Sequence, residues 1–226
     1  MNNELKKRLL TSIFLSVFLI SAFFYTFILI IVLIIIFLLS WIEFNGLIKR
    51  IISKVDYFSR IKRLLISAIT LIYLFYFSVI VFITMQQLQT YNKLNLLFLL
   101  LICICSDVGG FIFGKTFKGK KLTKISPNKT ISGSLGSFIL PLILVPIFFY
   151  LFLEKFDFFQ LLTLTILVSL ICQLGDLFIS FLKRKANVKD TGDLLPGHGG
   201  ILDRIDGIIF ALPFGLILWE FLIVMI

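Results

Sequence analysis

The sequence is poor in charged residues, which make up only 15% of its 226 positions, whereas hydrophobic residues make up 59%. A soluble domain of this length would be far more polar, so most of its surface must face lipid. The chain also has only three cysteines, Cys103, Cys105 and Cys172, all within apolar stretches. The Cys-x-Cys pair lacks the partners of a zinc site, so we interpret all three as reduced, structural side chains.

Several functional patterns are missing as well. The spacing Gly-x-x-x-x-Gly-Lys-Ser/Thr of a phosphate-binding P-loop does not occur. The basic segment over residues 115–130 has no run of interleaved stacking aromatics and is tied to a membrane, which argues against nucleic acid as a partner. The apolar run over residues 9–42 has no charge and no small-residue cleavage site, so we do not expect a cleavable signal peptide.

The apolar segments predict seven transmembrane helices. A straight helix over residues 9–42 would extend about 51 Å, against a hydrocarbon core of about 30 Å. We therefore expect two crossings there, joined by a turn near residues 21–26. The other predicted crossings are residues 64–88, 94–113, 133–153, 158–182 and 208–226. The expected fold class is an all-α integral membrane protein, a polytopic helical bundle.

The basic residues support this count. Seven alternating crossings place every Lys and Arg on one side of the membrane except Lys93 and Lys155. Because basic residues concentrate in cytoplasmic loops, this asymmetry predicts a cytoplasmic N-terminus. The formal net charge of +10 then describes a cytoplasmic face suited to anionic lipids and phosphorylated solutes. Membrane topology alone also accounts for many of these residues, above all in residues 49–63.

Acidic side chains inside apolar segments indicate where chemistry occurs, because a charge at mid-membrane costs about 2.5–3.5 kcal/mol. Asp107 shares a helical face with Gly110 and Gly114, whose small size lets a neighbouring backbone approach. Asp176 shares a face with Gln173, Ser180 and Lys183. We expect both acids to face a polar cavity.

Asp203 and Asp206 lie one helical turn apart before the last apolar segment, where they would converge on one ion or orient Arg204 and Lys189. Such hard oxygen ligands suit Mg²⁺. The alternative is that these acids are counter-ions of nearby Lys and Arg. Glu43 and Glu220, each expected near a helix end within reach of the interface, are interpreted as structural.

Two polar segments complete the candidate site. Residues 115–134 carry lysines and hydroxyl groups that can surround a triphosphate, among them Lys124, Ser126, Lys129 and Thr130. His198, the only histidine, lies in Pro-Gly-His-Gly-Gly, where flanking glycines allow close approach to a ligand. It would contact a phosphate or act as an acid or base, and the alternative is a structural turn.

Together these stretches resemble the phosphatidate cytidylyltransferase (CDP-diacylglycerol synthase) family. Residues 180–206 match the family's C-terminal signature without a break, and residues 106–115, 124–130 and 173–180 resemble further family segments. The signature runs through Ser180, Lys183, Arg184, Lys189, Asp190, Gly192, Leu195, Pro196, His198, Gly199, Gly200, Asp203, Arg204 and Asp206. Val108, Gly110 and the pair Ile131-Ser132 depart from the common family residues.

The resemblance implies a membrane nucleotidyltransferase of phospholipid biosynthesis, which converts CTP and phosphatidate to CDP-diacylglycerol and pyrophosphate. It implies Mg²⁺ at Asp176 and Asp203, and leaves a second cation and a homodimer open. The expected location is the bacterial inner (plasma) membrane with the active site facing the cytoplasm. We expect one catalytic domain, with hydrophobic N-terminal helices over residues 1–93 and the catalytic half over residues 94–226. The expected site residues, catalytic and then substrate-binding, are Asp176, Asp203, Lys183, Arg184, Lys189, Asp190, His198, Arg204 and Asp206, and Asp107, Lys124, Ser126, Lys129, Thr130, Gly199 and Gly200.

Three other functions compete with this one. A transporter or channel would also use buried acids, but the sequence shows neither an internal repeat nor paired broken helices. A CTP-dependent polyprenol kinase would use the same nucleotide and release CDP instead of pyrophosphate. A CDP-alcohol phosphotransferase is disfavoured because its Asp-Gly-x-x-Ala-Arg pattern is absent.

Overall fold

A computed structural model of the chain describes residues 17–18, 20–54, 56–87, 90–123, 126, 129–151, 157–193 and 199–224. Six helices in this part are long and apolar enough to cross a membrane. Within the same ranges there is no β-strand, only an isolated bridge between Lys121 and Thr130. The prediction of an all-α, polytopic membrane protein is confirmed.

The helices form two compact units that alternate along the sequence. The first unit comprises Met1–Gln86 and Leu182–Ile205, and the second comprises Gln87–Phe181 and Asp206–Ile226. Each unit therefore combines segments distant in sequence. The expected division of one domain at residue 93 stays a prediction.

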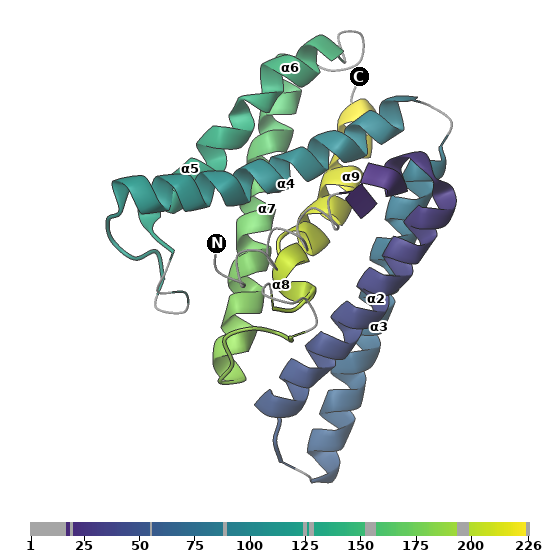
Figure 1. Ribbon diagram of the computed structural model, residues 1–226, viewed down its shortest axis with the longest axis vertical. Helices are drawn as coiled ribbons and strands as arrows, with labels where there is room; N and C mark the ends of the chain where they lie inside the picture. The colour runs from purple at the N-terminus through teal and green to yellow at the C-terminus, as the bar shows by residue number, and fades with distance from the viewer. Residues whose placement is uncertain are drawn as a thin grey trace, which may run out of the picture. The chain divides into compact units, whose positions relative to one another are not determined.

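The first unit is built on a pair of long helices, α2 (Thr26–Ile51) and α3 (Tyr57–Gln86), which lie side by side (Figure 1). The helical backbone breaks at Tyr25, whose φ of −119° and ψ of 111° are extended. This break falls inside the turn predicted at residues 21–26. The crossing predicted before it lies largely outside the described residues.

Both helices run further than the apolar segments predict. Helix α2 continues nine residues past position 42, and α3 begins at Tyr57 instead of residue 64. Lys and Arg are good helix formers, and their long side chains carry the charge away from lipid, so the helices extend past the apolar segments. The basic residues at positions 49–63 therefore lie mostly on the ends of these two helices.

The core of the second unit consists of aromatic and aliphatic side chains. Its helices are α4 (Thr90–Phe117), α5 (Ile131–Leu142), α6 (Leu144–Leu151), most of α7 (Phe158–Lys185), and α9 (Ile208–Val224). The ring of Phe98 lies 4.5 Å from that of Phe148 and 6.4 Å from that of Trp219, measured between centroids. Burial of these rings joins α4 to α6 and α9.

The crossing predicted at residues 133–153 is divided into α5 and α6 at Ile143. Pro141 lies inside α5, and Pro146 follows in α6. Proline has no amide hydrogen and its ring disturbs the preceding turn, which explains the break. The two short helices still count as one candidate span, Ile131–Leu151.

Helices α4 and α5 approach so closely that their backbones touch. A Cβ atom added at Gly133 would lie 2.8 Å from the carbonyl oxygen of Gly110, and one at Gly136 would lie 2.6 Å from that of Gly109. Only glycine fits at such positions. The prediction that small residues near Asp107 allow close helix packing is confirmed, and the partner is α5.

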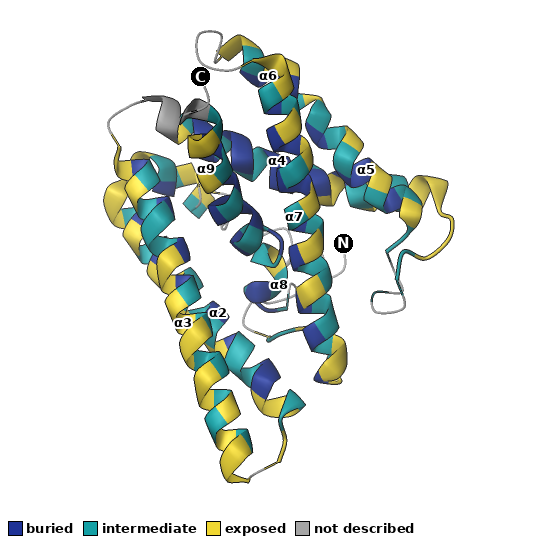
Figure 2. Cartoon of the chain, turned by 180° about the vertical axis from the view of Figure 1, so that it is seen from behind, coloured by how far each residue is buried: buried dark blue, intermediate teal, exposed yellow. Residues whose placement is uncertain are grey.

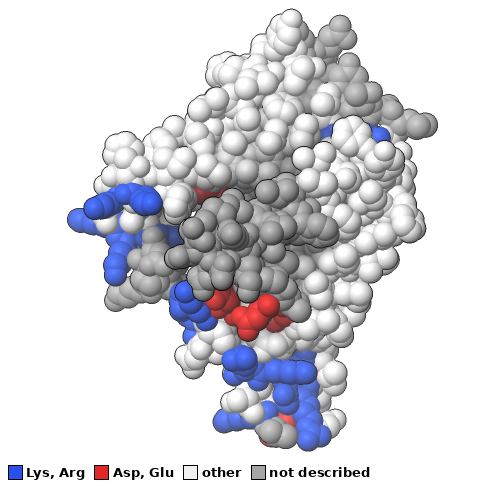
Figure 3. Space-filling model, in the orientation of Figure 1, with Lys and Arg blue, Asp and Glu red and all other residues white. Residues whose placement is uncertain are grey.

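The outer surfaces of the long helices are apolar, as lipid contact requires. Figure 2 shows α3 largely exposed along one side. Leu65, Ile72 and Phe75 are among the exposed apolar side chains of this helix. Charge is confined to a few places in Figure 3, and basic side chains gather at the connected ends of α2 and α3. This separation of apolar and basic surface is typical of a membrane protein with charged interfacial ends.

Candidate functional site

The carboxylate of Asp203, in the short helix α8 (Leu202–Ile205), is the centre of a hydrogen-bonded cluster in the first unit. Lys183 donates to its Oδ1 at 2.6 Å. Its Oδ2 accepts from the backbone amide of Thr191 at 2.8 Å, from the Thr191 hydroxyl at 3.0 Å and from the amide of Gly200 at 3.2 Å. The side chain of Asp203 is only 7% exposed, so this charge is buried and fully partnered.

The end of α7 explains how Lys183 reaches Asp203. Asn187 has a φ of 54°, and its amide donates to the carbonyl of Arg184 at 3.1 Å, while Val188 donates to that of Lys183 at 3.0 Å. These two bonds form a Schellman motif, in which asparagine tolerates the left-handed conformation. The chain reverses there, so that Thr191 and Asp203 return to Lys183.

Glu43 anchors the same segment from α2. It is only 4% exposed and accepts three hydrogen bonds, from the Thr191 hydroxyl at 2.8 Å and the amides of Ile201 at 3.0 Å and Leu202 at 2.8 Å. A Cβ atom at Gly192 would lie 3.0 Å from Glu43 Oε1. The predicted place of Glu43 near a helix end was wrong, because α2 extends to Ile51. Its structural role is to hold this segment.

Thr191 connects the two carboxylates. Its hydroxyl oxygen lies 2.8 Å from Glu43 Oε2 and 3.0 Å from Asp203 Oδ2. A hydroxyl has one proton, so it donates to one of these acceptors at a time. Sequence reasoning interpreted Glu43 as structural without identifying its partners, and it did not single out Thr191. The signal in the sequence was the position of Glu43. It follows 34 uncharged residues and comes about a turn and a half before the basic residues that begin at Lys49.

A second cluster lies in the second unit around Asp176 of α7. Lys129 forms an ion pair with Asp176 Oδ2, and the Ser180 hydroxyl donates to Oδ1 at 3.3 Å. The charges of Asp176 and Lys129 both act on Asp107 of α4. The sequence placed these three charged residues in one site, and the structure brings them together.

The backbone before α5 holds Lys129 in place. The amide of Lys129 donates to the carbonyl of Ser126 at 3.1 Å, and its own carbonyl accepts from Leu122 at 2.8 Å. Thr130 caps α5 by accepting from the amide of Gly133 at 3.1 Å. Ser126 and Thr130 therefore have structural partners, and Lys129 is the side chain that extends to α7.

The predicted face of α7 is also confirmed at Gln173. Its Oε1 accepts from the Ser134 hydroxyl at 2.7 Å, which ties α7 to the first turn of α5. Gln173, Asp176 and Ser180 thus direct their side chains as the spacing predicted. The polar side of α7 faces other polar groups of the protein.

Comparison with known proteins decides the family. Residues 2–222 match the family model described as the cytidylyltransferase family. The chain belongs to the cytidylyltransferase family.

Individual relatives carry a more specific name. The chain is 40% identical over 134 residues to a phosphatidate cytidylyltransferase of Bacillus subtilis, covering 59% of this chain and 50% of that protein. It is 48% identical over 120 residues to one of Staphylococcus epidermidis, covering 52% and 46%. For one of Rickettsia typhi the identity is 44% over 135 residues, covering 56% and 59%. This cytidylyltransferase family member thus spans about half the length of the curated relatives it matches.

The remaining predicted residues of this family member differ in their surroundings. Arg184, Lys189, Asp190 and Arg204 are exposed. Asp206 lies between α8 and α9, and its Oδ1 accepts from the adjacent Gly207 amide at 2.9 Å. Gly199 has a φ of 80°, which favours glycine, and Gly200 is buried against Thr191 and Glu43. Lys124 and His198 lie outside the described residues.

Asp176 fits Mg²⁺ better than Asp203 does. Asp176 is 28% exposed, and among the described residues only Ser180 contacts its Oδ1, whereas Asp203 is 7% exposed and accepts from Lys183 on Oδ1 and from three donors on Oδ2. No group of three or more His, Cys, Asp or Glu side chains gathers in the ranges that the structure describes. An ion would therefore rely on water and substrate phosphates for most of its ligands, which is usual for Mg²⁺.

Proposed function

We propose that this family member transfers CMP from CTP to phosphatidate, forming CDP-diacylglycerol and pyrophosphate. The observation that carries the proposal is the buried Lys183–Asp203 pair, 2.6 Å apart, within the segment that resembles the signature of phosphatidate cytidylyltransferases. The names of the relatives support the same activity. We further propose the bacterial plasma membrane as its location, with the site facing the cytoplasm.

The reaction needs positioning more than proton transfer. A phosphate oxygen of phosphatidate attacks the α-phosphorus of CTP, a new P–O bond forms, and the bond to the bridging oxygen breaks as pyrophosphate leaves. The nucleophile is an anion at neutral pH, so no strong base is required. The barrier lies mainly in charge repulsion and alignment.

The residues of the two clusters are suited to those tasks. The ammonium groups of Lys183 and Lys129 would donate to phosphate oxygens, while Asp203 and Asp176 hold them in place. Thr191 and Glu43 would fix Asp203 in turn. Mg²⁺, with Asp176 and Asp203 as proposed ligands, would supply neutralisation of phosphate charge.

The test is transfer of radioactive CMP to lipid. Purified protein in micelles of neutral detergent and phosphatidate receives [α-³²P]CTP and Mg²⁺, and label is measured in the organic phase. The proposal expects label that depends on phosphatidate and is lost with EDTA. The opposite result would have two parts: folded protein gives no lipid label from [α-³²P]CTP, but it releases CDP and transfers label from [γ-³²P]CTP to a polyprenol. That result would favour the kinase instead.

A matched pair of variants tests the site. Asp203→Asn removes one charge from the cluster and is expected to lower the turnover number at least about 100-fold, as loss of a key electrostatic group does. Asp193→Asn removes the same charge from an exposed position of the same segment and should retain near wild-type turnover. Equal activity of both variants would remove Asp203 from the proposed mechanism.

A further inference from the structure

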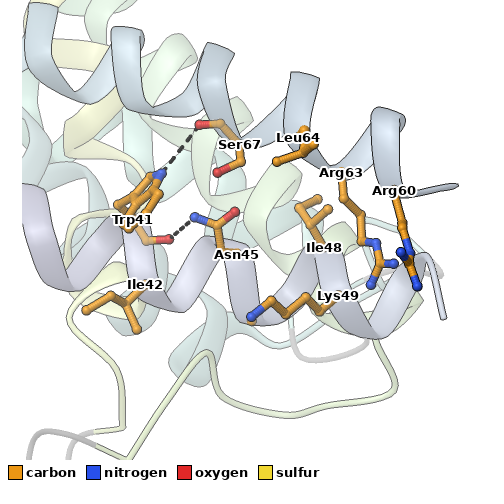
Figure 4. Close-up of a pocket in the computed structure, with 10 residues that line it drawn as sticks. Trp41, Ile42, Asn45, Ile48, Lys49, Arg60, Arg63, Leu64 and Ser67 are labelled. Atoms are coloured by element: carbon orange, nitrogen blue, oxygen red, sulfur yellow. Dashed lines mark hydrogen bonds between the residues drawn. The ribbon is translucent and has the colours of Figure 1, made fainter. Parts of the chain in front are cut away.

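A pocket of about 800 Å³ opens between α2 and α3 in the first unit. Figure 4 shows that it lies near the connected ends of the two helices, with side chains from both directed into the gap. Its lining is apolar on one part and basic on another, and includes Trp41, Asn45, Lys49, Arg60, Arg63 and Ser67. The pocket is not among the groups that the proposed cytidylyl transfer uses.

Three cations line this pocket without an acidic partner in the described part of the chain. Lys49 comes from α2, and Arg60 and Arg63 come from the first two turns of α3. Neither described ion pair of the protein includes any of them. Positive charges that line one cavity repel each other, so an anion that entered would relieve the repulsion.

Membrane topology alone does not explain this arrangement. Arg50 of α2, Lys62 of α3 and Lys54 of the connection between them are exposed, as Lys49 and Arg60 are, but do not line the pocket. Those three serve the requirement for basic residues at a membrane interface equally well. The difference between the two sets is that only Lys49, Arg60 and Arg63 line the cavity.

A second cavity of about 550 Å³, the apolar groove, lies between the same helices nearer their other ends. Its lining is Ile30, Leu33, Ile34, Phe37, Leu38, Phe75, Ser78, Val79 and Phe82. On α2, the series 30, 34, 37, 41, 45 and 48 advances by three or four residues, so both cavities open on the same side of that helix.

The two cavities together are longer than one lipid requires. Residues 30–49 of α2 extend about 29 Å, against about 20 Å for one leaflet with its headgroups, so a lipid with its phosphate at the basic end would occupy only the nearer part of the apolar lining. Trp41 donates through Nε1 to the carbonyl of Ser67 at 3.4 Å, at the level where the basic lining begins. Tryptophan and arginine concentrate at the headgroup level of a bilayer.

We propose that the α2–α3 hairpin binds an anionic membrane phospholipid, with its headgroup phosphate among Lys49, Arg60 and Arg63 and an acyl chain along the apolar groove. Charge complementarity selects an anionic headgroup. The adjoining groove, lined almost entirely by hydrocarbon, selects a lipid over a soluble phosphate. None of its lining residues belongs to the Asp203 or Asp176 cluster, and the proposal does not rest on the proposed reaction.

Native mass spectrometry of the purified chain in neutral detergent tests the proposal. The probes are dioleoyl phosphatidylglycerol and dioleoyl phosphatidylcholine, which differ in headgroup charge. The wild type should retain the anionic lipid preferentially. Replacement of Lys49, Arg60 and Arg63 by Gln should reduce its retention by about tenfold or more. The matched triple variant of Arg50, Lys54 and Lys62 should stay within about twofold of wild type.

A variant that changes no charge provides an independent test. Gly46 lines the pocket, and a Cβ atom there would meet nothing within 4 Å. Gly46→Leu should therefore fill the cavity in a folded protein and lower retention of the anionic lipid. The proposal would be overturned by wild-type protein without headgroup preference, by equal loss in both triple variants, or by unchanged retention in Gly46→Leu. Displacement of phosphatidylglycerol by equimolar glycerol 3-phosphate would also overturn it, in favour of a soluble anion.

Discussion

Removal of the Glu43 carboxylate should loosen the segment that carries Asp203. Glu43→Ala leaves three donors without their acceptor, namely the Thr191 hydroxyl and the amides of Ile201 and Leu202. Because these donors precede and follow the predicted glycine-rich motif in sequence, their loss acts on the segment from both ends. The effect should reach Asp203 through Thr191, which contacts both carboxylates.

The size of the effect follows from the burial of each donor. Leu202 is only 3% exposed, so its amide would lose its partner inside the protein, at about 1–3 kcal/mol. The Thr191 hydroxyl can turn to Asp203, and the half-buried Ile201 amide can reach water, so each adds less. Loss of the buried charge also relieves its desolvation cost. We expect a net local destabilisation of about 2 kcal/mol, or about 30-fold in the open population.

Hydrogen exchange measures this opening directly. Amides 201 and 202, followed by mass spectrometry in detergent, should exchange about 30-fold faster in Glu43→Ala than in wild type. Turnover with CTP and phosphatidate should fall in parallel. Glu220→Ala is the control, because it removes the same charge from an exposed position on α9. Wild-type exchange at amides 201 and 202 in Glu43→Ala would refute the anchoring role of Glu43.

Substitutions at three further positions test other contacts. Gly136→Ala should lower the stability by about 1–3 kcal/mol, because its Cβ would lie 2.6 Å from the Gly109 carbonyl oxygen. An unchanged thermal midpoint of unfolding would contradict the close crossing of α4 and α5. Gly46→Ala should instead raise the stability by about 0.5–1 kcal/mol, since its Cβ meets nothing within 4 Å, and a lower midpoint would disprove the open space there. Thr191→Val should cost about 1–3 kcal/mol and reduce turnover, whereas Thr191→Ser should restore both; equal defects in the two variants would show that the hydroxyl is not the essential group.

Patterns within single segments predicted the described fold well. Length and hydropathy identified the crossings on α3, α4, α7 and α9, because a lipid environment demands long uninterrupted apolar helices. The helix break at Tyr25 falls within the turn predicted from length alone. Helix ends were less accurate, since α2 and α3 extend into basic sequence that hydropathy assigns to a loop. The split at Ile143 followed from two prolines that span counting ignored.

The residues of the candidate site were likewise predicted only in part. The acids Asp107 and Asp176 were found from sequence, because a charge in an apolar segment is costly unless it has a partner. Lys129, the partner of Asp176, was found as part of a basic segment, and its ion pair depends on the backbone turn before α5. The joint role of Glu43 and Thr191 was not found, since 148 positions separate them and no local pattern relates them.

The sequence by itself determined the membrane-spanning character, the helical class and the segment that carries the family resemblance. These depend on hydropathy, on helical period and on motif spacing, which are properties of contiguous residues. Only the tertiary structure decided that Asp203 is held by Lys183, Thr191 and Gly200, and that Glu43 anchors the same segment. It also decided which cations of the α2–α3 hairpin converge on a cavity, because the direction of a side chain depends on how two helices pack.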